Sequence, residues 1–193
     1  MAGLKDDRPL RERPLDLIYI TFFAMHIPMT LLMDLQALYP AQFIPPLLTK
    51  LSDFYMAISN DPLIGGALYD PGRYSWFRSL LLLEGVFQLP VFILGAHGLL
   101  RGSRSIYVLL LIYGASTATT TYACLAVIFF TPTTNLETAA AKIASVTAEQ
   151  RTFLLVCYLP FLLIPLAMST DMAFRVLHLM HDGARASVAL KTR

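Results

Sequence analysis

The sequence predicts an all-α polytopic membrane protein, a four-transmembrane-helix bundle with a central pocket that lipid can reach. The first observation is composition: 56% of the 193 residues are hydrophobic and only 15% are charged, whereas soluble domains usually carry about 25% charge. The second is that four segments come close to or exceed the roughly 20 apolar residues that a spanning helix needs. These segments and their loops use nearly the whole chain, so we expect one bundle and no separate soluble domain.

The first predicted helix covers residues 16–37 and follows a charged cytoplasmic tail at residues 1–15. Its apolar centre, Leu17–Met33, contains no Asp, Glu, Lys or Arg. A cleaved signal peptide fits this segment poorly, because acids accompany the basic residues before it and no small-x-small cleavage site ends it. We therefore expect this helix to be retained.

The other three helices are predicted at residues 78–100, 105–130 and 152–178, and a second cytoplasmic tail at residues 180–193. These predictions rest on three apolar segments, Ser79–Leu100, Ser105–Phe130 and Thr152–Thr170. Together the segments contain a single acid, Glu84, and no Lys or Arg. Such long stretches almost without charge are typical of transmembrane helices.

The connections differ in length. The first, Tyr39–Trp76, is the longest; its prolines exclude one continuous helix, and its apolar content is too high for a solvated linker. We expect short helices there, packed on the membrane face of the bundle. A tight turn is predicted at Arg101–Arg104, and a loop with a short Ala-rich helical turn at Thr131–Arg151.

Charge predicts the orientation and excludes one class of partner. The net charge is +2 and no Lys/Arg run is present, so a nucleic-acid partner is not expected. With an even number of helices, both termini and the second connection share one side, which holds ten Lys and Arg residues against five on the other. The positive-inside rule then places both termini in the cytoplasm.

Cys124 and Cys157 both fall inside predicted helices, where a free thiol behaves as a small apolar residue, and nothing requires a disulfide.

Three polar residues share one face of the first predicted helix. His26, Thr30 and Asp34 are spaced i, i+4, i+8. Ionisable groups are costly in a bilayer and lipid cannot satisfy them, so this face must point into the bundle.

Further polar side chains follow on the other three helices. Glu84 and Gln88 repeat the i, i+4 spacing, and Pro90 can loosen the backbone and open space beside Glu84. Polar and aromatic residues on the third and fourth helices are Tyr113, Thr117, Thr120, Cys124, Tyr158 and Phe161. Faces of this kind that converge in a small bundle predict a buried pocket.

Asp34 and Glu84 would share that pocket as an acid pair. Two close carboxylates in a medium of low dielectric constant do not both ionise easily, so one is expected to keep its proton and hydrogen-bond the other. The pair then holds about one negative charge. Such a site suits an amine, a hydroxyl or a carbocation-like reaction intermediate.

Several of these residues also have a structural interpretation. His26 suits a buried hydrogen-bonding residue, and the run Ser116–Thr121 suits helix packing. Asp61 before Pro62 has the sequence of a helix N-cap followed by proline at the first helical position. The acid pair is hardest to explain by packing, so we favour a functional role for it.

Three long motifs resemble a known family: His26–Pro40 (HIPMTLLMDLQALYP), Trp76–Pro90 (WFRSLLLLEGVFQLP) and Tyr158–Pro165 (YLPFLLIP). They resemble the first, second and fourth helices of the sigma-2 receptor family, which belongs with the emopamil-binding sterol isomerases to the EXPERA group. The resemblance covers residues 17–170 and implies an EXPERA-type membrane domain at residues 16–179.

The resemblance implies roles for the candidate residues. Asp34 matches the acid that pairs with cationic amine ligands, and Glu84 matches the acid that hydrogen-bonds it. Asp61 matches a second acid linked to ligand binding. The remaining candidates for the ligand site are Gln88, Thr120, Tyr158, Phe161 and His26. The family also implies sterols or other lipids as ligands, no cofactor and no metal, a homodimer, and the endoplasmic reticulum membrane.

The chain departs from the family at three places. Phe161 stands where the receptors have a tyrosine, so one hydroxyl contact is expected to be lost. The sterol isomerases carry a histidine one turn before the second-helix acid, where this chain has Leu80, and an acid in the third helix, where residues 105–130 have none. Double-bond migration needs a proton donor and a proton acceptor, so the incomplete set argues against an enzyme.

Three hypotheses remain. The first is an intracellular sterol- or lipid-binding receptor or regulator of cholesterol homeostasis, which also takes cationic amphiphilic molecules. The second is a sterol Δ8-Δ7 isomerase-like enzyme. The third is a scaffold that controls the trafficking of a partner membrane protein, for instance in sterol transport.

Overall fold

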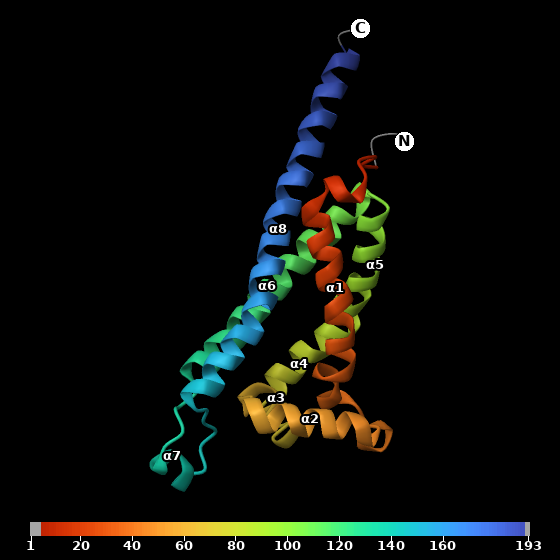
Figure 1. The fold of residues 1–193 in the computed structure, drawn as a ribbon. Helices are drawn as coiled ribbons and strands as arrows, with labels where there is room; N and C mark the ends of the chain where they lie inside the picture. The colour runs from red at the N-terminus through yellow and green to blue at the C-terminus, as the bar shows by residue number, and fades with distance from the viewer. Residues whose placement is uncertain (1–4, 192–193) are drawn as a thin grey trace.

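The computed structural model describes residues 5–191 as a bundle of long helices with shorter helices in its connections (Figure 1). Within this range the chain contains no β-strand. The segments long and apolar enough to span a membrane are Pro14–Leu38, Ser75–Leu100, Arg104–Phe130 and Ala148–Ala189. The predicted all-α bundle with four transmembrane helices is confirmed. Residues 1–4 and 192–193 of the two predicted tails lie outside the described residues.

The first span begins as α1 (Pro14–Leu32) and continues as a 3-10 helix, Asp34–Leu38. Pro14 takes the first helical position, where its missing amide hydrogen costs no hydrogen bond. This 3-10 helix ends at Leu38, and Tyr39 is extended, because Pro40 disfavours α-helical backbone at the residue before it.

The second span contains α4 (Ser75–Leu83), a π-helical turn (Glu84–Gln88) and α5 (Leu89–Leu100). Pro90 has no amide hydrogen, so the α-helical hydrogen bond to the carbonyl four residues earlier cannot form. The chain widens to a π turn directly before this proline. Pro90 was predicted to loosen the helix backbone beside Glu84. In the structure, this loosening is one extra residue in the helical turn.

The last two spans are α6 (Tyr107–Phe130) and α8 (Ala148–Lys191). At about 1.5 Å per residue, the 44 residues of α8 are about twice as long as the roughly 30 Å hydrocarbon core. The helix begins before the predicted residue 152 and continues past the predicted residue 178, through the described part of the expected tail. Figure 1 shows its C-terminal part rising well beyond the other helices.

Shorter helices occupy the connections, as predicted. α2 (Pro46–Ser59) and α3 (Pro62–Tyr69) lie between the first two spans, and α7 (Leu136–Ala140) lies between the last two. Figure 1 shows α2 crossing the end of the bundle opposite the termini. In the tight turn that leads to α6, Gly102 has a φ of 64°, a left-handed conformation that favours glycine.

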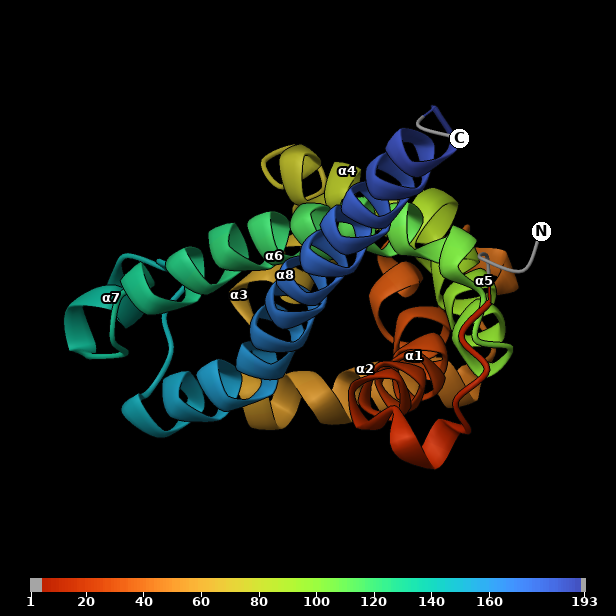
Figure 2. The same ribbon diagram turned by 90° about the horizontal axis from the view of Figure 1, so that it is seen from above.

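The four spans form two pairs, α1 with α5 and α6 with α8 (Figures 1 and 2). Gly114 of α6 lies where the second pair comes closest. A Cβ atom at this position would lie 2.6 Å from the Pro165 carbonyl oxygen and 2.9 Å from the Ser169 nitrogen of α8. Small residues let membrane helices approach to this degree, so Gly114 sets the separation of α6 and α8.

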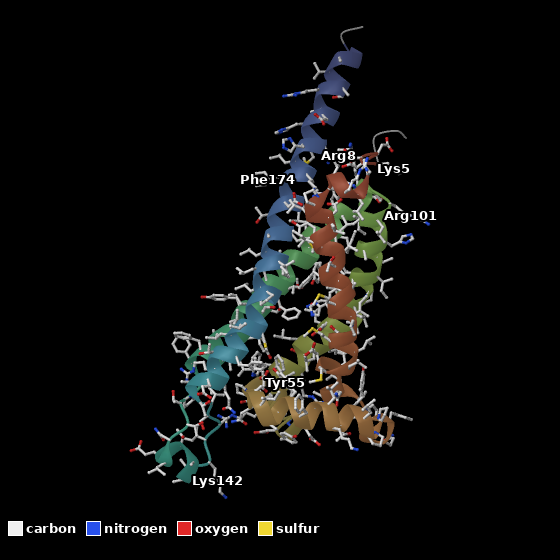
Figure 3. The ribbon with its side chains drawn as sticks, in the orientation of Figure 1. Lys5, Arg8, Tyr55, Arg101, Lys142 and Phe174 are labelled. Carbon is white, nitrogen blue, oxygen red and sulfur yellow. The ribbon has the colours of Figure 1, made fainter. Side chains whose placement is uncertain are left out.

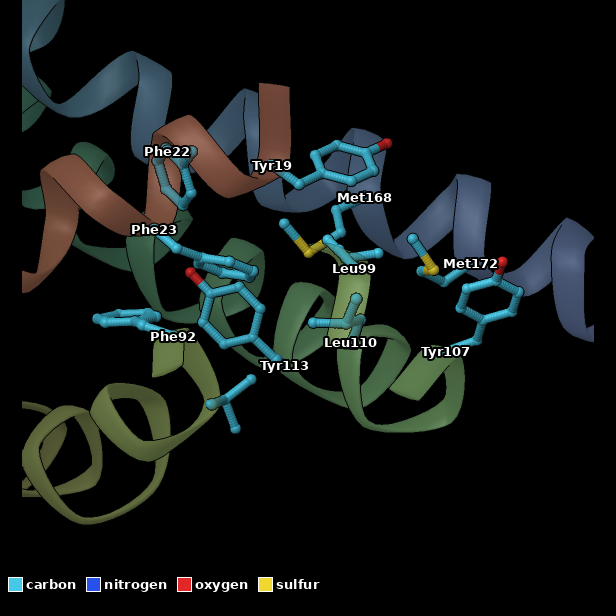
Figure 4. Close-up of a cluster of buried hydrophobic side chains, with 11 residues drawn as sticks. Tyr19, Phe22, Phe23, Phe92, Leu99, Tyr107, Leu110, Tyr113, Met168 and Met172 are labelled. Atoms are coloured by element: carbon cyan, nitrogen blue, oxygen red, sulfur yellow. The ribbon is translucent and has the colours of Figure 1, made fainter. Parts of the chain in front are cut away.

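An apolar cluster closes the half of the bundle that carries the termini. All four spans contribute to it, and Figure 4 shows large aromatic rings interlocking with methionine side chains. Its buried members are Tyr19, Phe22, Phe23, Val91, Phe92, Leu99, Tyr107, Leu110, Tyr113, Met168 and Met172. A second cluster fills the opposite half, where α3 packs between the spans: Ala37, Leu63, Ile64, Ala67, Phe77, Leu81, Cys124, Ile128, Val146 and Leu154.

A buried ionic cluster ties α8 to the start of α1. The Asp16 carboxylate accepts hydrogen bonds from Arg13 Nη1 at 2.7 Å and from Arg175 Nη1 at 2.6 Å. Arg13 also donates to the Leu99 carbonyl oxygen at 2.8 Å, and the Asp6 amide donates to the Gly102 carbonyl oxygen at 2.8 Å. The described part of the expected N-terminal tail therefore packs on the bundle. A buried charge cluster of this kind is stable only with every partner in place.

The close approach at Gly114 generates a stability prediction. Gly114→Leu forces α6 and α8 apart, because the new side chain would meet backbone rather than a movable side chain. We expect a loss of about 1–3 kcal/mol or more, measured as a lower thermal unfolding midpoint in detergent. Ala115→Leu, at the exposed neighbouring position, is the matched control and should unfold near the wild-type temperature. Equal effects of the two substitutions would contradict the assignment of this contact.

Candidate functional site

A cavity of about 230 Å³ lies between the two apolar clusters, within the bundle. Residues from every span and from α2 and α3 line it: His26, Met29, Met33, Asp34, Tyr55, Ile64, Phe77, Leu80, Leu81, Glu84, Gln88, Thr117, Thr120, Thr121, Cys124, Cys157, Tyr158 and Phe161. Most of its surface is apolar, and a few polar groups face inward. Cavities of this composition are typical of small-molecule sites.

His26, Asp34 and Glu84 form the polar centre of the cavity. Their donor atoms all lie within 4.8 Å of one another, and His26 Nε2 is 3.6 Å from Glu84 Oε1. Thr30 Oγ1 donates to Glu84 Oε1 at 2.5 Å. The first span therefore presents the predicted polar face to the second span. The two acids lie close together, but the expected hydrogen bond between them does not form among the described residues, because Glu84 accepts from Thr30 instead.

The π turn determines where Glu84 and Gln88 lie. Glu84 is its first residue and Gln88 its last, and both side chains line the cavity. In a π turn, hydrogen bonds join residues five apart instead of four, which enlarges the turn. Turns of this kind occur frequently at functional sites.

His26 joins the polar centre to the aromatic cluster. Its ring stacks on Phe92 with centroids 4.6 Å apart, and it contacts Phe161 at 4.6 Å and Phe22 at 5.2 Å. The side chain is 7% exposed, and its Nδ1 has no hydrogen-bond partner among the described residues. His26 thus combines the structural role considered from sequence with a position on the cavity wall.

Asp61 lies directly behind the cavity wall. It caps α3 through Oδ1, which accepts from the amides of Leu63 at 2.8 Å and Ile64 at 3.2 Å, so the predicted N-cap is confirmed. Its Oδ2 accepts from the hydroxyls of Tyr55 at 2.7 Å and Tyr158 at 2.8 Å. Burial, together with the Asp61 charge, raises the pKa of Tyr55, which favours the protonated, donating phenol.

Asp61 therefore joins three elements at the wall. Tyr55 comes from α2, Tyr158 from α8, and both rings line the cavity. Figure 3 shows Tyr55 where α2 meets the lower end of the bundle. Asp61 itself does not border the cavity, so it holds the residues that do.

The structure brings seven of the eight candidate residues into the cavity wall: His26, Asp34, Glu84, Gln88, Thr120, Tyr158 and Phe161. Tyr55 was not predicted as a site residue, because the first connection was interpreted only as short helices packed on the bundle. The available signal was the spacing i, i+4, i+7, i+11 of Leu48, Ser52, Tyr55 and Ser59, which places them on one helix face. In the structure this face is buried or half-buried.

The polar centre offers two carboxylates and one imidazole to a ligand in apolar surroundings. Charge in such surroundings is costly unless it is paired, so this arrangement favours a cation. The same three donors have the chemistry of a divalent-metal site, with His and carboxylate ligands. An ammonium group with an apolar body suits both the carboxylates and the surrounding walls.

The fold and this site define a multi-pass α-helical membrane protein with an acid-centred cavity inside the membrane. Comparison with protein families finds a match to EXPERA (EXPanded EBP superfamily) over residues 47–172. The chain belongs to this family.

Individual relatives agree with that assignment. Sigma intracellular receptor 2 of Xenopus tropicalis is 32% identical over 163 residues, which cover 84% of this chain and 90% of that protein. The Homo sapiens protein of the same name is 34% identical over 158 residues, covering 81% and 86%. Efficient mitochondria targeting-associated protein 19 of Schizosaccharomyces pombe is 28% identical over 189 residues, covering 95% and 90%. The resemblance to the sigma-2 receptor family is confirmed.

The shared carboxylate of Asp61 generates a second prediction. Asp61→Asn keeps one oxygen for the α3 cap and replaces the acceptor for the two tyrosine hydroxyls with a donor. We expect it to destabilise the protein by about 1–3 kcal/mol. Tyr55→Phe and Tyr158→Phe should each destabilise the wild type yet add little to Asp61→Asn, because the partner is already lost.

Thermal unfolding of the single and double variants in detergent measures this coupling. Asp53→Asn, at an exposed position of α2, is the control and should be neutral. Strictly additive effects of the tyrosine and Asp61 substitutions would show that the hydroxyls do not depend on this carboxylate.

Proposed function

We propose that this chain is an intracellular membrane receptor or regulator that binds sterols, related lipids and cationic amphiphilic amines in its cavity and takes part in cholesterol homeostasis. The acid pair of Asp34 and Glu84 inside an apolar cavity is the observation that carries the proposal. Membership of the EXPERA family supports it, and so do relatives whose name is Sigma intracellular receptor 2.

The proposed binding mode divides the ligand between two kinds of surface. A protonated amine pairs with the negative charge of Asp34 and Glu84, which stabilises a charge that the apolar cavity would otherwise disfavour. The apolar body of the ligand lies against side chains such as Phe77, Leu81 and Phe161. A sterol hydroxyl can donate to the same carboxylates, so sterols and amines would compete for one site.

We also propose the endoplasmic reticulum membrane, with both termini in the cytoplasm, and a homodimer. The family resemblance supports the location and the dimer. The Lys/Arg distribution supports the orientation: Lys5, Arg8 and Arg101 gather at the end that carries the termini, and Lys142 lies at the opposite end (Figure 3).

A trafficking role is a second candidate. A relative that aligns with 95% of this chain bears the name efficient mitochondria targeting-associated protein 19, which connects the family with protein targeting. A ligand-dependent membrane protein could control a partner membrane protein, so this role is compatible with the receptor. Substitutions in the cavity would then leave partner binding intact, whereas substitutions in the connection at residues 60–76 would abolish it.

A receptor binds a sterol and leaves it unchanged, whereas a sterol isomerase shifts one of its double bonds. The purified protein in nanodiscs is incubated with a panel of sterols, which are then extracted and analysed by chromatography and mass spectrometry. We expect one sterol to be enriched with its double bonds unchanged. A product with a shifted double bond would overturn the proposal and make Asp34 and Glu84 acid–base catalysts.

Replacing either acid of the pair with its neutral amide tests the same binding site. Losing one partner of a buried charge pair costs about 2–5 kcal/mol, so Asp34→Asn should raise the Kd of a cationic amphiphile by about 30-fold or more. Glu84→Gln should also weaken binding, and a neutral sterol should lose less affinity in both variants. Radioligand binding on purified protein measures the change, with Asp53→Asn on α2 as the control. Unchanged amine affinity in Asp34→Asn would contradict the proposed site.

A further inference from the structure

Helix α2 exposes an apolar stripe that no described part of the bundle covers. Leu47, Leu51, Phe54 and Ile58 are spaced i, i+4, i+7 and i+11, so they share one face of the helix. Their side chains are 74%, 38%, 67% and 47% exposed, respectively. A stripe of large apolar residues at every turn needs an apolar environment outside the bundle.

Two other faces complete the helix. The packed face holds Ser52, Tyr55 and Ser59, against the bundle and the cavity. A third face holds exposed polar residues, among them Lys50 and Asp53. α2 therefore meets three environments at once: protein on one side, an apolar medium on the next, and water on the last.

The position of α2 identifies the apolar medium. The helix crosses the end of the bundle opposite the termini instead of running along it (Figure 1). Its 14 residues are too few for a span, which needs roughly 20. Leu31 and Leu32, at the end of α1, are 38% and 42% exposed, so the lipid-facing surface of the bundle continues to this level.

We propose that α2 is an interfacial membrane helix whose stripe of Leu47, Leu51, Phe54 and Ile58 lies among the acyl chains just below the headgroups, in the leaflet remote from the termini. Amphipathic helices that lie in a membrane plane have this division into an apolar and a charged face. A narrow stripe flanked by Lys50 and Asp53 suits the boundary between acyl chains and water better than a broad protein contact. Trp76 at the start of α4, 39% exposed, supplies an aromatic anchor typical of that boundary.

The depth of α2 in the membrane affects the cavity wall. Tyr55 lies on the packed face of the same helix and lines the cavity, where Asp61 holds its hydroxyl. The depth of α2 in the leaflet therefore determines where one wall of the cavity lies.

Fluorescence in vesicles tests the seating. Trp76 is the single tryptophan of the chain, so Trp76→Phe gives a silent background. Into it we place either Phe54→Trp, in the stripe, or Asp53→Trp, the adjacent residue on the polar face. The full-length proteins are reconstituted in phosphatidylcholine vesicles, with and without lipid brominated on the upper part of its acyl chains.

We expect the Phe54→Trp protein to emit at shorter wavelength and to be strongly quenched by the brominated lipid. The Asp53→Trp protein should emit at longer wavelength, be quenched by aqueous iodide and respond little to bromine. Iodide quenching of both proteins would overturn the inference by placing the stripe in water. Short-wavelength emission from Phe54→Trp without bromine quenching would also overturn it, because a protein surface, such as a second copy, would then cover the stripe. Both substitutions are at exposed positions, and thermal unfolding checks that each variant is folded.

Discussion

The cost of an ionisable group in hydrocarbon determines the arrangement of this protein. Asp34 and Glu84 lie on spans whose outer faces are apolar, with Met25 and Val86 among the exposed residues. Each acid must face inward, and each needs a polar neighbour there. Glu84 meets this need through Thr30 and the imidazole of His26, and Asp34 lies beside Glu84 and His26. The inner faces of the helices, and so the way the bundle packs, follow from this requirement.

Two apolar clusters turn that polar centre into a cavity. Aromatic rings and methionines close the half that carries the termini, and α3 with its neighbours fills the other. Between them, the π turn before Pro90 keeps Glu84 and Gln88 on the inner surface. Asp61 fixes the far wall by holding tyrosines from two different helices. An apolar space with a few convergent polar groups results, and this combination supports a ligand-binding function in a family of membrane proteins.

The sequence predicted those features that depend on helical periodicity. The shared face of His26 and Thr30 follows from spacing, and Asp61 before Pro62 was sufficient for the N-cap. Asp34 reaches the same site from the 3-10 helix that follows α1. Features that depend on contacts between distant residues could not be predicted, such as the bond from Tyr158 to Asp61, 97 residues apart. The length of α8 was underestimated because hydropathy locates the membrane rather than the end of a helix. α8 continues to Lys191, and no proline after Pro165 interrupts it.

Photoaffinity labelling shows whether the cavity around Asp34 and Glu84 holds the ligand. A sterol with a photoreactive group is irradiated with the protein in nanodiscs, and the labelled residues are identified by peptide mass spectrometry. We expect labelling of cavity residues such as Met33 and Cys157, lost in excess unlabelled sterol or cationic amphiphile. Labelling confined to outer-face residues such as Val86 and Phe130, and unaffected by competitor, would contradict it.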